Sequence, residues 1–185
     1  MTKKVVLVNG NPESGENSLN LFSAELNKEL KKNGITTKHH ILSEKQIKSC
    51  IGCWDCWWKT PGVCRQKDDA SEILKDIINA DITVFLSPLI MGMYSAKLKI
   101  FHERLIPLLH PYIEIRNNES HHRKRYPKYP KLAFIFENRD ATDEEINNVK
   151  YILDRLSLNF HSNIEYFHSI EQINPKSASH EISHI

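Results

Sequence analysis

The sequence has no cysteine outside one short stretch. All four cysteines lie between Cys50 and Cys64, and all three tryptophans lie within the same 15 residues. A disulfide framework distributed over the fold is therefore disfavoured. Reduced thiols gathered at one place are typical of metal or redox chemistry in the cytoplasm, which is the location we expect.

Long hydrophobic runs are also missing. No apolar stretch approaches the ~18 residues of a membrane-spanning helix, and the run from Val5 to Val8 is too short for the core of a secretory signal peptide. We therefore expect no membrane partner. Glycine is scarce as well, and the sequence has neither a Gly-x-Gly-x-x-Gly fingerprint nor a Walker loop, which argues against a dinucleotide fold and an NTPase.

Net charge is small, at +2 over 185 residues, and the 40% apolar and 26% charged fractions are those of an ordinary globular domain. Positive charge is concentrated between residues 116 and 131. The basic residues there are Arg116, Arg123, Lys124, Arg125, Lys128 and Lys131, against one acidic residue, Glu119. Such a stretch can attract a polyanion and leaves a non-catalytic binding module as an alternative function. A solvated loop is the favoured interpretation, so nucleic acid is not an expected partner.

β-branched and apolar runs alternate with helical patterns along the chain. The runs predict strands at residues 3–8, 36–42, 82–87, 132–137 and 163–168, and the polar content of 36–42 suggests a sheet edge. Apolar residues at helical spacing predict helices at residues 18–33, 70–79, 98–108 and 142–156. Pro107 is expected to kink or end the third of these helices. The alternation predicts an α/β fold, a single-domain, doubly wound, five-stranded parallel sheet with helices on both faces. We expect this domain to cover residues 1–173 and a C-terminal tail without a pattern to cover residues 174–185.

Such sheets bind ligands at the carboxyl ends of their strands, so the connecting loops there are the candidate sites. The first loop, residues 9–18, runs directly into a helix amino terminus. Free backbone amides and the side chains of Ser14, Asn17 and Ser18 would suit a phosphate. A helix-capping turn made by Asn17 or Ser18 is the alternative.

The loop after the third strand, residues 87–99, is apolar and aromatic, with Pro88 and Gly92 shaping its backbone. Its Met91, Met93 and Tyr94 could wall a flat aromatic ligand. Internal packing of the same side chains is the alternative.

Several segments together resemble one family. They are the Asn- and Ser-rich turn after the first strand, Lys67-Asp-Asp69 after the cysteines, Ala80 to Pro88, Tyr94 to Lys99, and Glu103-Arg104. Over residues 3 to 160 the chain is similar to the flavodoxin-like NAD(P)H-dependent FMN reductases, and its cysteine loop is similar to that of iron–sulfur flavoproteins. The resemblance implies a flavodoxin-like fold, a bound FMN and NAD(P)H as co-substrate.

The function implied is an oxidoreductase that takes hydride from NAD(P)H and reduces a small acceptor such as a quinone, a nitro compound or a flavin. The resemblance places the FMN phosphate against Asn11, Ser14, Asn17 and Ser18. It places the isoalloxazine ring against Pro88, Leu89, Ile90, Met91, Gly92 and Met93. Because the hydride chemistry belongs to the flavin, no catalytic acid or base is expected. A homodimer or larger homo-oligomer is expected, since a partner subunit commonly helps to close the flavin pocket in this family.

The chain departs from the family pattern in two loops. It has Gly10-Asn11-Pro12-Glu13 where the family usually has Gly-Ser-Pro-Arg, so a serine and a basic residue near the phosphate are missing. Residues 138–142 have no glycine, whereas this loop is often glycine-rich in the family. The usual last helix is expected to be absent or shortened, because the tail has no pattern.

Three interpretations of Cys50, Cys53, Cys56 and Cys64 stay open. Spacers of two, two and seven residues on one tight loop suit a four-cysteine 4Fe–4S cluster, which would make the protein an electron-carrying iron–sulfur flavoprotein. The second interpretation is free thiols in a loop that covers the flavin edge, with the tryptophans as packing. Zinc is disfavoured, because structural zinc usually takes ligand pairs from two separated turns.

The ten histidines are expected at the surface or at an interface. The adjacent pairs, His39 with His40 and His121 with His122, point in different directions and cannot by themselves form a metal site. His121 and His122 flank the basic stretch and are candidate substrate contacts.

Overall fold

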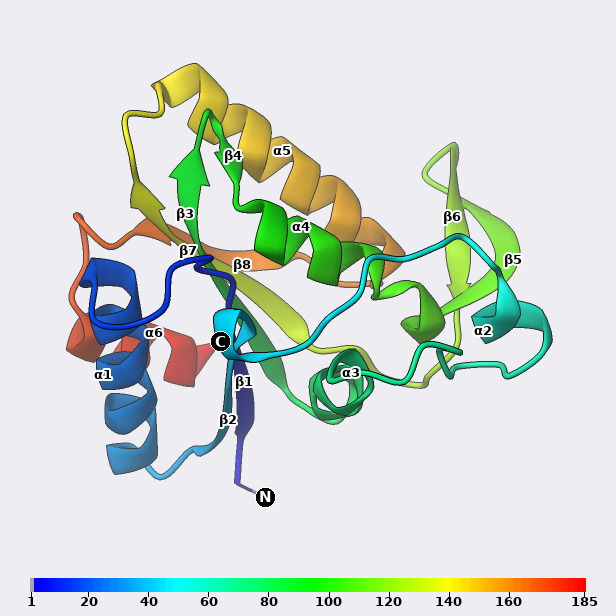
Figure 1. The fold of residues 1–185 in the computed structure, drawn as a ribbon, viewed down its shortest axis with the longest axis horizontal. Coiled ribbons are helices and arrows are strands. Elements are labelled where there is room, and N and C mark those ends of the chain that lie inside the picture. The colour runs from blue at the N-terminus through cyan, green and yellow to red at the C-terminus, as the bar shows by residue number, and fades with distance from the viewer. Residues whose placement is uncertain (1) are drawn as a thin grey trace.

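A mainly parallel sheet forms the centre of the protein, of which the computed structural model describes residues 2–185 (Figure 1). Its strands are β1 (Lys4–Asn9), β2 (Thr36–Ile41), β3 (Ile82–Ile90), β4 (Met93–Tyr94), β7 (Lys131–Asn138) and β8 (Ile164–Ser169). Five parallel strands follow the order β2-β1-β3-β7-β8, and β4 pairs antiparallel with β3. The predicted five-stranded parallel sheet is confirmed, and β4 is an addition that the sequence pattern does not predict.

Helices cover both faces of the sheet (Figure 1). They are α1 (Ser18–Lys32), α2 (Asp55–Trp58), α3 (Ala70–Ile78), α4 (Ala96–Glu103), α5 (Asp143–Asn159) and α6 (Pro175–His184), with 3₁₀ turns η1 (Leu42–Glu44) and η2 (Ile106–Leu108). The helices α1 and α6 pack on one face, and α3, α4 and α5 pack on the other. Among the described helices, none is both long and apolar enough to cross a membrane.

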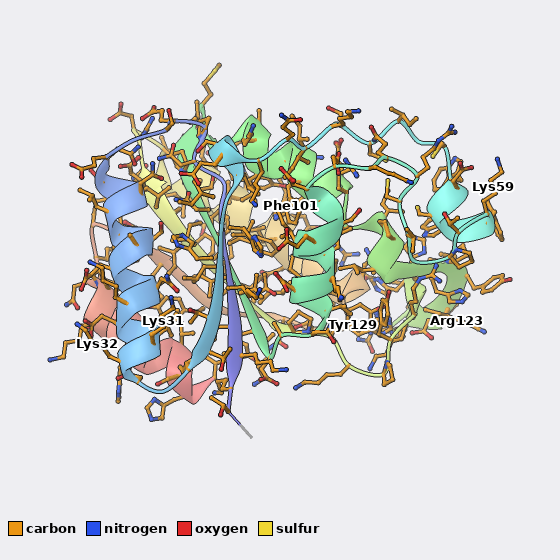
Figure 2. The ribbon with its side chains drawn as sticks, turned by 60° about the horizontal axis from the view of Figure 1, so that its bottom comes forward. Lys31, Lys32, Lys59, Phe101, Arg123 and Tyr129 are labelled. Atoms are coloured by element: carbon orange, nitrogen blue, oxygen red, sulfur yellow. The ribbon has the colours of Figure 1, made fainter. Side chains whose placement is uncertain are left out.

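Burial on both faces explains why the strand sequences lack polar alternation. In β1, Val5 and Leu7 pack with α1 and α6, whereas Val6 and Val8 pack with α3, α4 and α5. Phe101 of α4 lies inside this second layer, as Figure 2 shows. Successive residues of the strand therefore stabilise opposite layers of the core.

The edge prediction for β2 is confirmed, since β2 pairs on one side with β1 and ends the sheet. The helix predicted at 98–108 is interrupted near Pro107, as expected: α4 ends at Glu103, and Pro107 lies in the separate turn η2. Proline cannot supply the backbone N–H that a continuing helix needs, so the chain turns here.

The C-terminal tail contains the 10-residue helix α6, so the last helix, expected to be absent or shortened, is present, and the expectation of a tail without a pattern is corrected. Asn174 accepts a hydrogen bond from Ser177 N and caps α6, and Pro175 occupies its first turn. The helix buries Ala178 and Ile182 against the sheet layer that contains α1. With so few apolar positions its periodicity was weak, but the Asn-Pro start is a helix signal that could have revealed it.

The basic stretch is not a solvated loop, because most of it belongs to a hairpin of β5 (Leu109–Arg116) and β6 (Glu119–Lys124). Asn117 and Asn118, at φ 52° and 62°, form the tight turn, as expected for a type I′ hairpin. Several of the basic groups have partners within the fold: Arg116 Nη2 donates to Leu158 O at 2.6 Å, and Lys128 pairs with Asp81. Arg123 lies at the outer end of the molecule (Figure 2).

Candidate functional site

Asparagine side chains hold the loop between β1 and α1 in shape. Asn11 is fully buried, and its Nδ2 donates to Asn17 Oδ1 at 2.8 Å and to Asn20 Oδ1 at 3.2 Å. Asn20 donates in turn to the carbonyl groups of Glu13 and Gly15. Asn17 caps α1 by accepting from Asn20 N at 3.0 Å. Of the expected phosphate contacts, Asn11 and Asn17 are therefore engaged in the loop's own hydrogen bonds.

Ser14 and Ser18 are exposed beside the amino terminus of α1. The first-turn amides of this 15-residue helix carry the positive end of its dipole. Exposed hydroxyl groups next to such a terminus form a surface suited to an anion.

Gly10 brings this loop against α4. A Cβ atom on Gly10 would stand 2.6 Å from Leu98 Cβ, so a larger residue does not fit there. Gly10 N donates to Leu86 O of β3 at 2.7 Å, and Gly10 O accepts from Ser95 Oγ at the start of α4. The first loop is thus fixed beside β3 and α4 at the carboxyl edge of the sheet.

Arg139, in the segment after β7, contacts the first loop through its guanidinium group. It donates through Nη1 to Glu13 Oε1 at 2.7 Å and through Nε to Glu137 Oε2 at 2.7 Å. The hydrogen bond from Arg139 lowers the pKa of Glu13, and the bonds to Glu13 and Glu137 raise the pKa of Arg139. Asp140 adopts a positive φ of 64°, so the tight turn here does not need a glycine.

Residues 87–99 do not form the irregular loop that the sequence predicts. β3 continues to Ile90 and returns as β4 through Met91 and Gly92, at φ 52° and 71°. Met91 is 95% exposed and Ile90 is 39% exposed, whereas Pro88 and Leu89 are buried within the strand. Of the expected ring contacts, those at the hairpin tip are therefore accessible and the first two lie beneath them.

All four cysteines line one small cavity, together with Ile106 and Pro107 of η2 and the carboxyl end of α4. The chain turns tightly between them, with Gly52 at φ 63° and Trp54 at φ 61°. Trp57 Nε1 donates to Ile106 O at 3.2 Å and holds α2 against η2. The structure thus converges thiols that the sequence only places near one another.

The spacing of the thiols bears on the kind of group they suit. Among residues 2–185, no three His, Cys, Asp or Glu side chains meet closely enough for a single metal ion. A tetrahedral zinc holds its thiolates about 3.8 Å apart, whereas an iron–sulfur cubane is larger and separates them further. The described side chains are therefore not arranged around a single zinc ion.

Burial, followed by the charges of Cys64, Cys50 and Cys53, raises the pKa of the Cys56 thiol to about 11. Cys56 is therefore protonated near neutral pH, and a neutral thiol is a weak nucleophile. A bound metal centre is what would stabilise four thiolates at this place.

Arg104 lies beside the cysteines, directly after α4. Its Nη1 and Nη2 donate to the two carboxylate oxygens of Asp68 at 2.6 and 2.9 Å, and Nη1 also donates to Lys48 O at 2.6 Å. Burial opposes the charge of Arg104, but its interactions with the Asp68 carboxylate and with the Cys64 sulfur outweigh this effect and raise the pKa of Arg104. No local spacing rule connects residues 68 and 104, so the sequence did not predict this pair.

Three histidines expected at the surface are buried. His40 Nε2 is 2.9 Å from Asp76 Oδ2, and His121 Nε2 is 3.0 Å from Glu119 Oε2. His102 packs against the rings of Phe85 and Tyr94. His121 and His122, the suggested substrate contacts, lie on β6 of the hairpin rather than in the loops at the carboxyl edge of the sheet.

The family model described as NADPH-dependent FMN reductase matches residues 3–125. The chain belongs to the NADPH-dependent FMN reductase family. The match to this family includes the first loop, the cysteine loop, the β3–β4 hairpin and α4.

Two curated relatives are named iron–sulfur flavoproteins. One, from Methanocaldococcus jannaschii, is 37% identical over 105 residues, which is 57% of this chain and 53% of the relative. The other, from Archaeoglobus fulgidus, is 32% identical over 107 residues, 58% of this chain and 47% of the relative. These matches therefore extend over about half the length of the relatives.

A solved structure shows the same fold at low sequence identity. It is an FMN-dependent NADH-azoreductase from Bacillus anthracis in complex with FMN, with a TM-score of 0.59 and 14% identity over 97% of this chain and 93% of that chain. The flavodoxin-like α/β fold expected for an FMN reductase is confirmed by this similarity.

In this FMN reductase family member, α4 separates the two candidate sites. Ser95 caps the start of α4 and donates to Gly10 of the first loop, and Arg104 follows its end beside the cysteines. Eight helical residues span about 12 Å, and α2 lies at the opposite end of the molecule from α1 (Figure 1). In the described part of the chain, the cavity is lined by neither the first loop nor residues 88–93, so within one subunit the cysteines do not cover these loops.

Proposed function

We propose that this chain is an FMN-dependent oxidoreductase that accepts hydride from NAD(P)H and passes it to a small acceptor such as a quinone, a nitro compound or a flavin. The observation that carries the proposal is the meeting of a helix amino terminus and an exposed hairpin at the carboxyl edge of β1 and β3 in a chain of the FMN reductase family. Strand order reverses between β1 and β3, and open sheets of this kind bind ligands at that point.

The first loop is proposed to bind the FMN phosphate. Ser14 and Ser18 would donate from their exposed hydroxyl groups, together with first-turn amides of α1. Asn11 and Asn17 are proposed to act mainly by holding the loop open in the required shape, since their side chains already bind within it.

The tip of the β3–β4 hairpin is proposed to contact the isoalloxazine ring. Ile90, Met91, Gly92 and Met93 offer accessible or half-buried surface there, and Pro88 and Leu89 support the hairpin from within the sheet. The flexible, polarizable side chain of Met91 is suited to an aromatic face. FMN supplies the hydride chemistry when bound, and the chain supplies binding and orientation. A homodimer is proposed, with a second subunit covering the exposed ring face.

The test compares ligands with and without the phosphate. Flavin-free protein should quench the fluorescence of added FMN at one per chain, and NADPH should bleach the bound flavin without oxygen. Ser14→Ala with Ser18→Ala should weaken FMN by roughly tenfold through the loss of donors to a charged group, and leave riboflavin binding unchanged. Ser71→Ala, an exposed serine on α3, is the control. Wild-type protein that fails to bind FMN would falsify the proposal.

A second candidate function, an iron–sulfur flavoprotein that carries electrons, is favoured by one specific observation: Cys50, Cys53, Cys56 and Cys64 surround a single cavity. Four thiols are the usual ligand set of a 4Fe–4S cluster. The relatives' names point in the same direction. The four cysteines would hold the cluster, which would supply one-electron chemistry.

Anaerobic purification tests this candidate. About four irons and four sulfides per chain, with broad visible absorption in addition to that of flavin, are expected for a 4Fe–4S cluster. Cys53→Ser should abolish the iron while FMN content stays the same. An iron content near zero after reconstitution with iron and sulfide would rule out the cluster and leave the FMN reductase proposal intact.

A further inference from the structure

A buried arginine borders the cysteine cavity without a part in binding flavin. Arg104 is 1% exposed and lines the cavity together with the four cysteines. Charged side chains are seldom fully buried unless they are paired. Pairing with Asp68 accounts for the burial of Arg104, and the lining of the cavity places its guanidinium group beside the thiols.

The guanidinium group of Arg104 ties together the two ends of the cysteine loop. It binds Lys48 O, two residues before Cys50, and the Asp68 carboxylate, four residues after Cys64. Lys48 N also donates to Asp68 Oδ2, at 3.0 Å. One buried side chain thus sets where the loop leaves and rejoins the fold.

Further hydrogen bonds close the base of the loop next to this contact. Gln46 N donates to Asp69 Oδ2 at 2.7 Å, and Asp69 N donates to Gln46 O at 3.2 Å. Gln66 Nε2 donates to Ser49 O at 2.7 Å. The side chain of Arg104 is consequently held in one orientation relative to the cysteines.

The three hydrogen bonds of the buried guanidinium come from Nη1 and Nη2, and Nε makes none of them. Pairing through Nη1 and Nη2 leaves Nε–H on a different edge of the planar group. Arg104 Nε is buried and has no hydrogen-bond partner within residues 2–185. An unsatisfied buried donor is costly, and a native fold rarely keeps one unless another group completes the site.

We propose that Arg104 is a positioning residue of the cysteine site, which clamps the loop through Lys48 and Asp68 and donates its Nε–H to a sulfur of the bound cluster. The inference rests on the iron–sulfur candidate function. The Asp68 carboxylate offsets the positive charge of Arg104. The effect of Arg104 on the cluster therefore comes from the Nε–H that it donates. Such a bond stabilises the more negative, reduced cluster and shifts its reduction potential upward.

Arg104→Lys isolates this N–H, because lysine keeps a positive charge for Asp68 but has neither Nε–H nor a planar fork. Arg155→Lys is the matched control, since Arg155 is a half-exposed arginine on α5 paired with Glu119. Each protein is reconstituted anaerobically with iron and sulfide. Iron and FMN per chain are then measured, and the midpoint potential is taken from a redox titration followed by EPR. We expect a more negative cluster potential in Arg104→Lys, unchanged FMN, and wild-type values in Arg155→Lys.

An unchanged potential with full iron in Arg104→Lys overturns the inference and leaves the cluster function standing. Wild-type protein that binds FMN but takes up no iron overturns the cluster function, and the inference with it. If Arg104→Lys does not fold, pulsed EPR of the reduced wild-type cluster with ¹⁵N-labelled arginine decides. Among the described residues, Arg104 is the arginine that lines the cavity, so a ¹⁵N coupling supports the hydrogen bond and its absence overturns it.

Discussion

Arg139 Nη1 lies 2.7 Å from Glu13 Oε1, although the two residues are 126 positions apart in the chain. The sequence has a glutamate where the family pattern usually has arginine, and the fold brings an arginine to that glutamate from the loop after β7. A basic group from a distant segment is thus placed beside the first loop.

Two charge-neutralising substitutions test the role of this pair in FMN binding. Glu13→Gln removes a carboxylate beside the proposed phosphate site and leaves Arg139 paired only with Glu137, so we expect roughly two- to fivefold tighter FMN binding at low salt. Arg139→Gln should weaken FMN binding by a similar factor. Fluorescence titration with FMN measures both, and riboflavin, which lacks the phosphate, is the control ligand. Equal FMN affinity of both variants at low ionic strength would contradict this role for Arg139.

Ser95 joins the first loop to α4. Its Oγ accepts from Leu98 N at 3.1 Å as a helix cap and donates to the buried carbonyl of Gly10. Ser95→Ala should lower the free energy of unfolding by about 2–3 kcal/mol, because the lost cap accounts for about 1 kcal/mol and the unsatisfied carbonyl adds to it. Urea unfolding measures the change. Thr142→Ala, which removes the more exposed cap of α5, should lower the free energy of unfolding by only about 1 kcal/mol. If both variants lose the same free energy of unfolding, the hydrogen bond from Ser95 to the Gly10 carbonyl contributes nothing to stability.

His102 makes the fold sensitive to acid. Burial, and then the charge of Lys99, lowers the pKa of His102 to about 3, and both ring nitrogens are buried without partners among the described residues. The unfolded chain binds this proton below pH 6.5 and the native state does not. The contribution of neutral His102 to the free energy of unfolding is therefore fully present above pH 6.5. It decreases as the pH falls toward 3, by up to about 1.4 kcal/mol per pH unit.

His102→Phe should flatten this dependence, because phenylalanine fills the space between Phe85 and Tyr94 without taking up a proton. Denaturant unfolding at several pH values between 4 and 7, compared with wild type, gives the difference in slope. The difference isolates His102 from His39, whose pKa is also lowered by burial, to about 4. Parallel stability curves for the two proteins would show that His102 is not the group responsible.

The C-terminal helix is expected to be part of the stable core. Ile182 is fully buried in the layer formed with α1, so Ile182→Ala should lower the free energy of unfolding by about 2–4 kcal/mol. Lys176→Ala on the exposed side of α6 should change it by less than about 0.5 kcal/mol. If neither Ile182→Ala nor Lys176→Ala changes the free energy of unfolding measured with denaturant, α6 does not stabilise the domain.

The amino-acid pattern alone specified the order of strands and helices and the parallel sheet, because apolar periodicity reports directly which faces of an element are buried. It also located the loop between β1 and α1 and the cysteine group, since both are continuous in sequence. It missed the hairpin around Asn117 and Asn118 and the helix after Asn174, where capping and turn residues carried the signal and apolar periodicity was weak.

Only tertiary packing decided which distant side chains meet. Arg104 pairs with Asp68 across 36 positions and Arg139 with Glu13 across 126, and no local spacing rule connects either pair. Packing also placed the first loop and the cysteine cavity at opposite ends of α4. The reason is physical: periodicity along a chain encodes which faces are buried, but contacts between elements depend on how the whole core closes around them.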